Sequence, residues 1–356
     1  MWRIELEVSR QACRFLDPTR GFEPDEPDEP DEKTTEIRGD PLAAGHTTHD
    51  VADMGFEPER PDVEQRVARA RAGFDPFAPD DERGEVTRRS LAEAEEVLRG
   101  RLPLGEALVA PNLFPYDRYS AVTIPSKVNF VPLSGFSKER LSEAIQADLG
   151  YLKRVRQVDG EGLRHCRPNG NYLQLAGSSI VHPHHQRVTS PVPADQLRKV
   201  EAGLSLYGGD YLGDLPRLDE GGERWVGGEG SILYLTAFAP PGRIDVVGVL
   251  VGRSSNFDLT AEDVGALSRS LLRIFAYLQE EDLASFNFAL YGLEGADGFT
   301  VHCRLSPPFL LSNALGVSDV NYLDISPAEP PAFFYPEAAA SSLRPRFENP
   351  ESGGAR

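Results

Sequence analysis

The length, composition and charge of the chain exclude several classes of protein. Its 356 residues suffice for one large or two ordinary domains, and its formal net charge of −19 argues against nucleic acid as a partner, because phosphates attract a basic surface. The three cysteines lie far apart and form no C-x-x-C pair, which predicts a reducing, cytoplasmic compartment without a disulfide framework. No apolar run approaches the roughly 20 residues of a membrane span, so we expect no membrane partner.

The first 33 residues predict a strand followed by a segment without fixed structure. Residues 1–16 alternate apolar and polar side chains, which is typical of an edge strand. Residues 23–32 repeat Glu, Pro and Asp and contain nothing to bury, so we expect a disordered loop there. This tract also carries part of the negative charge.

The chain from 34 to 195 predicts a mixture of helices and strands. Asp62 is a suitable N-cap for one helix, and Ser137 for a longer amphipathic helix. Alternating apolar residues from Tyr172 to Leu175 indicate a strand that leads to a histidine cluster. The predicted helices span 62–72, 85–100 and 137–158, and the other predicted strands lie at 107–110 and 120–124.

The second half, residues 196–335, repeats the order strand, strand, helix, strand. Its helix spans about 260–279 and begins with a Thr-Ala-Glu-Asp capping sequence. The last strand of each half carries histidines, which are His182 and His184 in the first half and His302 in the second. The predicted strands of this half lie at 231–239, 245–251, 285–290 and 299–305.

Together these elements predict an α+β fold made of two similar halves. Each half is an antiparallel sheet with a long helix packed on it. The chain is then divided into an N-terminal strand with the acidic tract, a first half, a second half, and a C-terminal helix with a loose tail. These predicted divisions are 1–33, 34–195, 196–335 and 336–356.

The stretch from Asn171 to Gln186 concentrates the side chains suited to chemistry. Three of the seven histidines lie within four residues, at His182, His184 and His185, after a Gly-Ser-Ser turn. Neutral imidazole serves both as a nucleophile and as a metal ligand, whereas a short histidine-rich piece is also compatible with a solvated loop. We expect His185 to be exposed, because it lies on the opposite strand face from His184. We also expect His46, His49 and His165 to be exposed.

The spacing in this stretch resembles the active-site segment of the galactose-1-phosphate uridylyltransferases, members of the histidine triad superfamily. The family ending H-x-H-x-Q, shared with the dinucleoside polyphosphate and ADP-glucose phosphorylases, matches His182, His184 and Gln186. The resemblance implies two histidine-triad-like repeats. Weaker matches follow the family order: R-x-D-P-L at 38–42, N-x-F-P at 112–115, the late H-I-E-I-L-P-R strand at 302–308, and P-E-x-A-A…L-R at 336–344.

The resemblance implies nucleotidyl transfer in two steps. His184 would attack the α-phosphorus of a nucleotide, and a phosphate or sugar phosphate would then take the nucleotide from the histidine. Gln186 would hold the phosphoryl oxygens, and because a glutamine is no acid it favours transfer or phosphorolysis over hydrolysis. Further nucleotide or phosphate contacts are expected from Arg38, Asn112, Asn171, Gly177, Ser178, Ser179 and His182.

The zinc ligands of the family are largely missing from this chain. The family often binds a structural zinc through C-P-F-C, a further histidine and the first histidine of H-P-H. Here the first piece reads D-P-F-A at 75–78, and the further histidine is replaced by Asn129. His182 alone remains, and His302 alone remains of a second, C-terminal H-x-H pair. Since a zinc site needs three or four ligands, we predict no metal and no other cofactor.

The expected partners are small molecules. The resemblance implies a nucleotide sugar or a dinucleotide, of UDP-hexose or galactose-1-phosphate type, together with a phosphate or sugar-phosphate acceptor. It also implies a homodimer, since family members are commonly dimers. Two other interpretations stay open, a hydrolase of nucleotide conjugates and a non-catalytic member that binds nucleotides.

Overall fold

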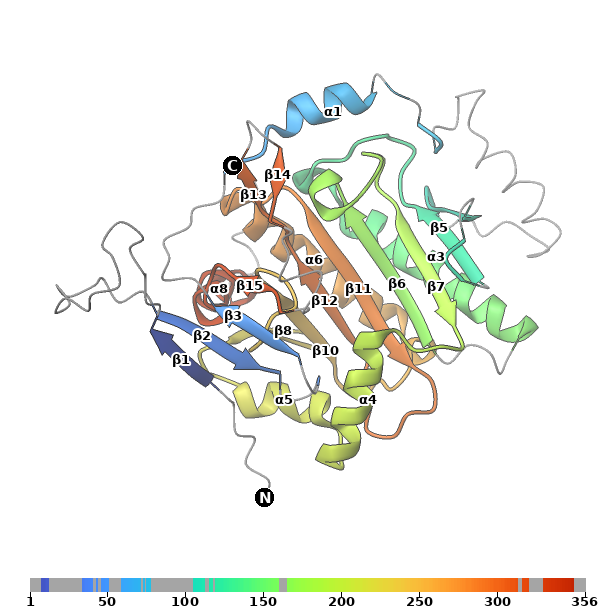
Figure 1. Cartoon of the computed structure of the whole chain (residues 1–356). Helices are drawn as coiled ribbons and strands as arrows, with labels where there is room; N and C mark the ends of the chain where they lie inside the picture. Colours follow the sequence, from blue (N-terminus) through green and yellow to red (C-terminus); the bar gives the residue numbers. More distant parts are fainter. Residues whose placement is uncertain are drawn as a thin grey trace.

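The computed structural model describes residues 8–12, 34–40, 43, 46–50, 59–71, 73, 75–77, 105–112, 115–117, 119–159, 165–312, 316–319 and 329–348. Within these residues a nine-stranded antiparallel sheet forms the centre of the protein, in the order β4-β5-β7-β6-β11-β12-β10-β9-β8 (Figure 1). Its strands are β4 (Leu108–Pro111), β5 (Tyr119–Ile124), β6 (His165–Tyr172), β7 (His185–Ser190), β8 (Trp225–Glu229), β9 (Ile232–Thr236), β10 (Val246–Leu250), β11 (Phe286–Leu293) and β12 (His302–Ser306). The acidic tract, the helix predicted at 85–100 and the C-terminal tail from 349 lie outside the described residues.

The two halves of this sheet have the same strand order. In the first half, β4 and β5 are followed by α3 (Lys138–Val158), β6 and β7, and β7 lies between β5 and β6. In the second half, β9 and β10 are followed by α6 (Ala261–Glu280), β11 and β12, and β12 lies between β10 and β11. The antiparallel pair β6–β11 joins the halves. The predicted α+β fold of two similar halves is confirmed, while the residue boundaries of the divisions stay a prediction.

The helices of the two halves lie on one face of the sheet. α3 and α6 pack against each other, and Figure 1 shows both behind the strands. The opposite face is partly covered by two helices that the sequence analysis did not predict, α4 (Asp195–Tyr207) and α5 (Tyr211–Asp219), which pack on Leu293 of β11. We call this opposite face, which carries the site described below, the open face.

The predicted helix starts are confirmed by their capping contacts. The Ser137 hydroxyl accepts a hydrogen bond from the Arg140 amide at 3.2 Å, which begins α3. Thr260 and Asp263 form a reciprocal capping box that begins α6. These contacts satisfy amide groups that have no partner inside the helix.

A smaller sheet brings the two ends of the described chain together. It consists of β1 (Val8–Ala12), β2 (Thr34–Gly39), β3 (Thr47–Asp50) and β15 (Pro331–Ala332), and β15 runs parallel to β3. β1 confirms the N-terminal strand over the residues described. The other elements are α1 (Val63–Arg71), β13 (Leu310–Ser312), β14 (Val317–Ser318), α8 (Pro336–Leu343) and α9 (Pro345–Glu348). None of the helices in the described part of the chain has the length and apolar character needed to cross a membrane.

The strand predicted at 172–175 is wrong in its position. β6 ends at Tyr172, because Leu173 adopts a positive φ of 66° and the next three residues form a 3-10 turn. Leu173 and Ala176 are nevertheless buried, so the turn points apolar side chains into the core. Alternation alone does not separate such a turn from a strand.

A buried charge cluster connects α3 to the start of β7. Oδ1 of Asp148 lies 2.7 Å from Nη1 of Arg187 and accepts a hydrogen bond from the Thr123 hydroxyl, while Oδ2 lies 3.1 Å from Nδ1 of His185. The Arg187 guanidinium is fully buried and stacks 4.7 Å from the centroid of the Tyr151 ring. Although burial acts to raise the pKa of the Asp148 carboxyl, Arg187 and His185 hold it below its usual value. This cluster fixes which face of β7 points toward the helices.

We expect Asp148→Asn to destabilise the protein strongly. The variant leaves the Arg187 guanidinium buried without its counter-charge, which costs about 3–5 kcal/mol in free energy of unfolding. Urea unfolding measures the loss. The control is Glu139→Gln, an exposed position in the first turn of the same helix, where the expected loss is below about 1 kcal/mol. Equal stability of the two variants would contradict the role of the cluster.

Candidate active site

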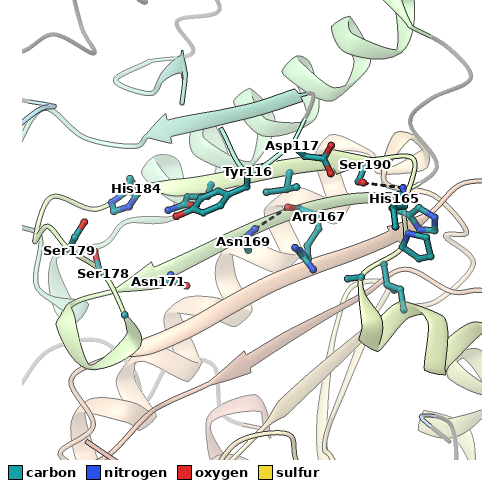
Figure 2. Close-up of a pocket in the computed structure, with 17 residues that line it drawn as sticks. Tyr116, Asp117, His165, Arg167, Asn169, Asn171, Ser178, Ser179, His184 and Ser190 are labelled. Atoms are coloured by element: carbon teal, nitrogen blue, oxygen red, sulfur yellow. Dashed lines mark hydrogen bonds between the residues drawn. The ribbon is translucent and has the colours of Figure 1, made fainter. Parts of the chain in front are cut away.

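A cavity of about 670 Å³ lies on the open face, over β6 and β7 (Figure 2). Its floor consists of alternate side chains of the two strands, which point to the same face. These are His165, Arg167, Asn169 and Asn171 from β6, and Gln186, Val188 and Ser190 from β7, with His184 directly before β7. The rest of the lining is formed by Tyr116, Asp117, Gly177, Ser178, Ser179, Val192, Pro193, Ala194 and Leu197.

The structure brings most of the predicted site residues together in this cavity. They gather at one end, where Figure 2 shows Ser178 and Ser179 on the same side as His184 and close to Asn171. The residues of the predicted set that line the cavity are Asn171, Gly177, Ser178, Ser179, His184 and Gln186. Their roles toward a nucleotide stay predictions.

His184 is held in the tautomer that suits a nucleophile. Its Nδ1 lies 2.9 Å from the carbonyl oxygen of His182, and because a carbonyl only accepts, Nδ1 is the nitrogen that carries the proton. Nε2 of the neutral ring therefore keeps its lone pair. Burial lowers the pKa of His184 below its ordinary value, and the neighbouring His185 and His182 act in the same direction. The ring is thus kept neutral.

Several polar groups of the turn before the histidines form hydrogen bonds within the turn itself. The Gly177 and Ser178 amides donate hydrogen bonds to the Gln174 and Leu173 carbonyls at 2.9 and 3.1 Å, and the Ser178 hydroxyl donates to the Ile180 carbonyl at 2.6 Å. Gly177 has a positive φ of 87°, which favours glycine. Ser179 is exposed to the cavity. Of the two serines, Ser179 is the one placed to offer its hydroxyl to a ligand.

Three predicted contact residues lie outside the cavity lining. His182 is fully buried behind the site. Asn112 donates from its side-chain amide to the Ser120 hydroxyl at 3.3 Å. Arg38 lies on β2 of the smaller sheet, where its guanidinium is buried and forms ion pairs with Glu36 and Glu337 at 2.9 and 2.8 Å. The structure therefore does not bring Arg38 to His184, and its predicted phosphate contact stays untested.

The residues at the other end of the cavity were not predicted from the sequence. His165, Arg167 and Asn169 share the face of β6 with Asn171. The signal was present, because residues two apart on a strand face the same way, but the strand was predicted about seven residues too late in the chain. Tyr116, which directly follows the N-x-F-P match, was also missed; it is 69% exposed and extends over the cavity floor (Figure 2).

Three histidines expected at the surface are not there. His46 and His165 are buried, each 5% exposed. His185 is partly buried and contacts Asp148. Polar neighbours in the sequence do not show that a histidine is buried when distant elements cover it. An example is α3, which lies behind His185.

Among the described residues, no group of three or more histidine, cysteine, aspartate and glutamate side chains is arranged to hold a metal ion. The expectation that the chain works without zinc stays a prediction.

The comparisons with known proteins agree with the motifs. No protein-family model matches the chain. An uncharacterised protein of Archaeoglobus fulgidus is 28% identical over 317 residues, which cover 87% of this chain and 91% of that protein. Among solved structures, ADP-glucose phosphorylase from Arabidopsis thaliana with bound ADP-glucose matches with a TM-score of 0.65 and 16% identity over 87% of this chain and 98% of that one. A uridylyltransferase matches with a TM-score of 0.58 and 16% identity over 68% of this chain and 85% of that one. The chain therefore has the fold of this ADP-glucose phosphorylase and of this uridylyltransferase.

Proposed function

We propose that the protein is a nucleotidyltransferase or phosphorylase that works through a covalent nucleotidyl-His184 intermediate. The observation that carries the proposal is the neutral imidazole of His184, which lines a polar cavity while its Nδ1 is fixed by the His182 carbonyl. A neutral imidazole attacks without a separate general base. This is the property that nucleotidyl transfer requires.

The first step forms one bond and breaks one. The Nε2 lone pair attacks the α-phosphorus, and the bond from phosphorus to the bridging oxygen breaks, so that the leaving group takes the electron pair. The imidazole of the adduct carries a positive charge, and the His182 carbonyl stabilises the Nδ1–H of that cation. In the second step an oxygen of the acceptor attacks phosphorus, and the P–N electron pair returns to Nε2. No proton has to leave His184 in either step.

The polar groups around His184 suit the charges of a phosphoryl group. Asn171, Ser179 and Gln186 line the same end of the cavity and offer side-chain hydrogen-bond donors. Gln186 supplies no acid for an expelled group, which favours a phosphate or sugar phosphate over water as the acceptor. One neighbour of the same fold is a phosphorylase solved with ADP-glucose, and we extend a nucleotide sugar to this chain as the proposed substrate. A homodimer remains part of this proposal.

Arg167 supplies the positive charge of the cavity. Among the described residues its guanidinium forms no ion pair with a carboxylate. On β6 it lies four residues from Asn171, about 13 Å along the same face of the strand. We propose that Arg167 binds the phosphate group next to the α-phosphate that His184 attacks.

The direct test is intact mass spectrometry. Incubation with UDP-glucose, ADP-glucose and diadenosine tetraphosphate should give a UMP or AMP adduct that is absent from His184→Ala. The control is His49→Ala, a histidine of the smaller sheet that pairs with Glu329. Absence of an adduct with all three substrates rules the proposal out, and steady release of nucleoside monophosphate without an acceptor identifies a hydrolase instead.

The pH dependence of adduct formation should reflect the buried histidine. Because burial lowers the pKa of His184 from 6.5, the ring stays neutral as the pH falls through that value. We expect the single-turnover rate to remain constant down to pH 6.5 and to fall only at lower pH. A rate already halved at or above pH 6.5 would show that His184 is not the titrating nucleophile.

Arg167→Gln should weaken binding of the nucleotide sugar. Loss of a hydrogen bond to a charged group costs about 1.5–3 kcal/mol, which corresponds to at least about a tenfold increase in Kd. Calorimetry in a His184→Ala background measures binding without turnover. The matched control is Arg198→Gln, an exposed arginine of α4 paired with Asp195. A change below twofold for Arg167→Gln argues against the phosphate contact.

A further inference from the structure

The residues at the place of the family's zinc do not fit a metal ion in this chain. A histidine binds zinc through a ring nitrogen that carries a lone pair. Both ring nitrogens of His182 are instead engaged by oxygen atoms of the protein. Nδ1 lies 2.8 Å from Oδ2 of Asp75, and Nε2 lies 2.7 Å from the carbonyl oxygen of Ser126. Both oxygens act as acceptors, so the ring donates from both sides.

Asp75 is itself fixed in position. Its other carboxylate oxygen, Oδ1, accepts a hydrogen bond from the Phe77 amide at 3.0 Å. The Asp75 side chain is 18% exposed and the His182 side chain 1% exposed, so their contact is largely shielded from water. An ion pair with this burial and with additional hydrogen bonds is not weakened by solvent as a surface pair is.

Phe77 connects the same turn to both histidines. Its ring is edge-on to the His182 ring, with centroids 5.7 Å apart, and tilted against the His184 ring, with centroids 5.2 Å apart. Phe77 is buried with Ala110, Val122 and Ile124 of β4 and β5. The turn at 75–77 is therefore anchored in the sheet and contacts each of the two rings.

The position of His182 determines that of the nucleophile. The His182 carbonyl accepts the Nδ1–H of His184 at 2.9 Å, so the residue that Asp75 and Ser126 hold is also the residue that orients His184. The chain of contacts runs from Asp75 to the His182 ring, and from the His182 carbonyl to the His184 ring. A small displacement of the reacting atom is sufficient to slow an enzymatic step.

We propose that the Asp75–His182 pair, supported by Phe77 and the Ser126 carbonyl, positions the nucleophile His184 in place of a metal ion. Asp75 and His182 are positioning residues, since neither lines the cavity. The effect on reaction rate rests on the proposed function, whereas the hydrogen-bonded state of His182 does not.

The first test observes the His182 ring directly. In protein labelled with ¹⁵N at histidine, with the signal assigned by its loss in His182→Gln, we expect both ring nitrogens to carry protons. The spectrum should not change after dialysis against a chelator or on addition of zinc. One unprotonated ring nitrogen that shifts when zinc is added would overturn the proposal, and this result is independent of any catalytic activity.

The second test separates positioning from binding. Asp75→Asn should slow formation of the nucleotidyl-His184 adduct about 10- to 100-fold, while the Kd for the nucleotide stays within about twofold of the unmodified chain. The matched control is Asp62→Asn, an exposed aspartate that caps α1 by accepting from the Gln65 amide, where asparagine caps equally well.

An Asp75→Asn variant that forms the adduct at the original rate would overturn the positioning role. So would one that loses nucleotide binding as much as it loses rate. If the unmodified chain forms no adduct, the proposed function fails, and the histidine spectrum still decides whether the pair replaces a metal ion.

Discussion

The register between β6 and β7 is the constraint on which the site depends. Asn169 is paired with Gln186, and Gly170 with His185, so that alternate residues of the two strands reach the cavity. A slip of one residue would turn every side chain of β7 to the other face. His184 and Gln186 would then point toward α3, and His185 would enter the cavity. The buried pair of Asp148 with Arg187 stabilises the register found here, because it requires Arg187 on the helix side.

The two halves of the sheet place a histidine in comparable positions but in different surroundings. His302 begins β12 on the open face, as His184 precedes β7 on the same face. In the second half this face is covered by α4 and α5, and the His302 ring is stacked on Tyr291 with centroids 5.1 Å apart. Burial lowers the pKa of His302 to about 3. One repeat thus places its imidazole in the lining of the large cavity, and the other places it beneath α4 and α5.

Local pairing, rather than net charge, explains how a strongly acidic chain provides a cavity that is lined by an arginine. Several arginines are neutralised inside the structure: Arg38 by Glu36 and Glu337, Arg243 by Asp319, and Arg304 by Asp245. Arg167 has no such carboxylate in the part of the chain that the structure describes, and it lies in the cavity. The position of Arg167 is therefore decided by the fold, because the pairs of the other arginines with Glu337, Asp319 and Asp245 depend on contacts between distant segments.

The sequence by itself determined the α+β class and the repeated order of elements, and it singled out His184, the residue that we propose as the nucleophile. Capping residues, helical spacing of apolar side chains and the H-x-H-x-Q pattern are local signals, and local contacts are sufficient to express them. Only the tertiary structure decided that Arg38 belongs to the smaller sheet, that Arg167 takes a place in the cavity, and that Asp75 engages His182 across 107 residues. Each of these depends on strand register and on packing between remote parts of the chain, which local sequence patterns alone do not determine.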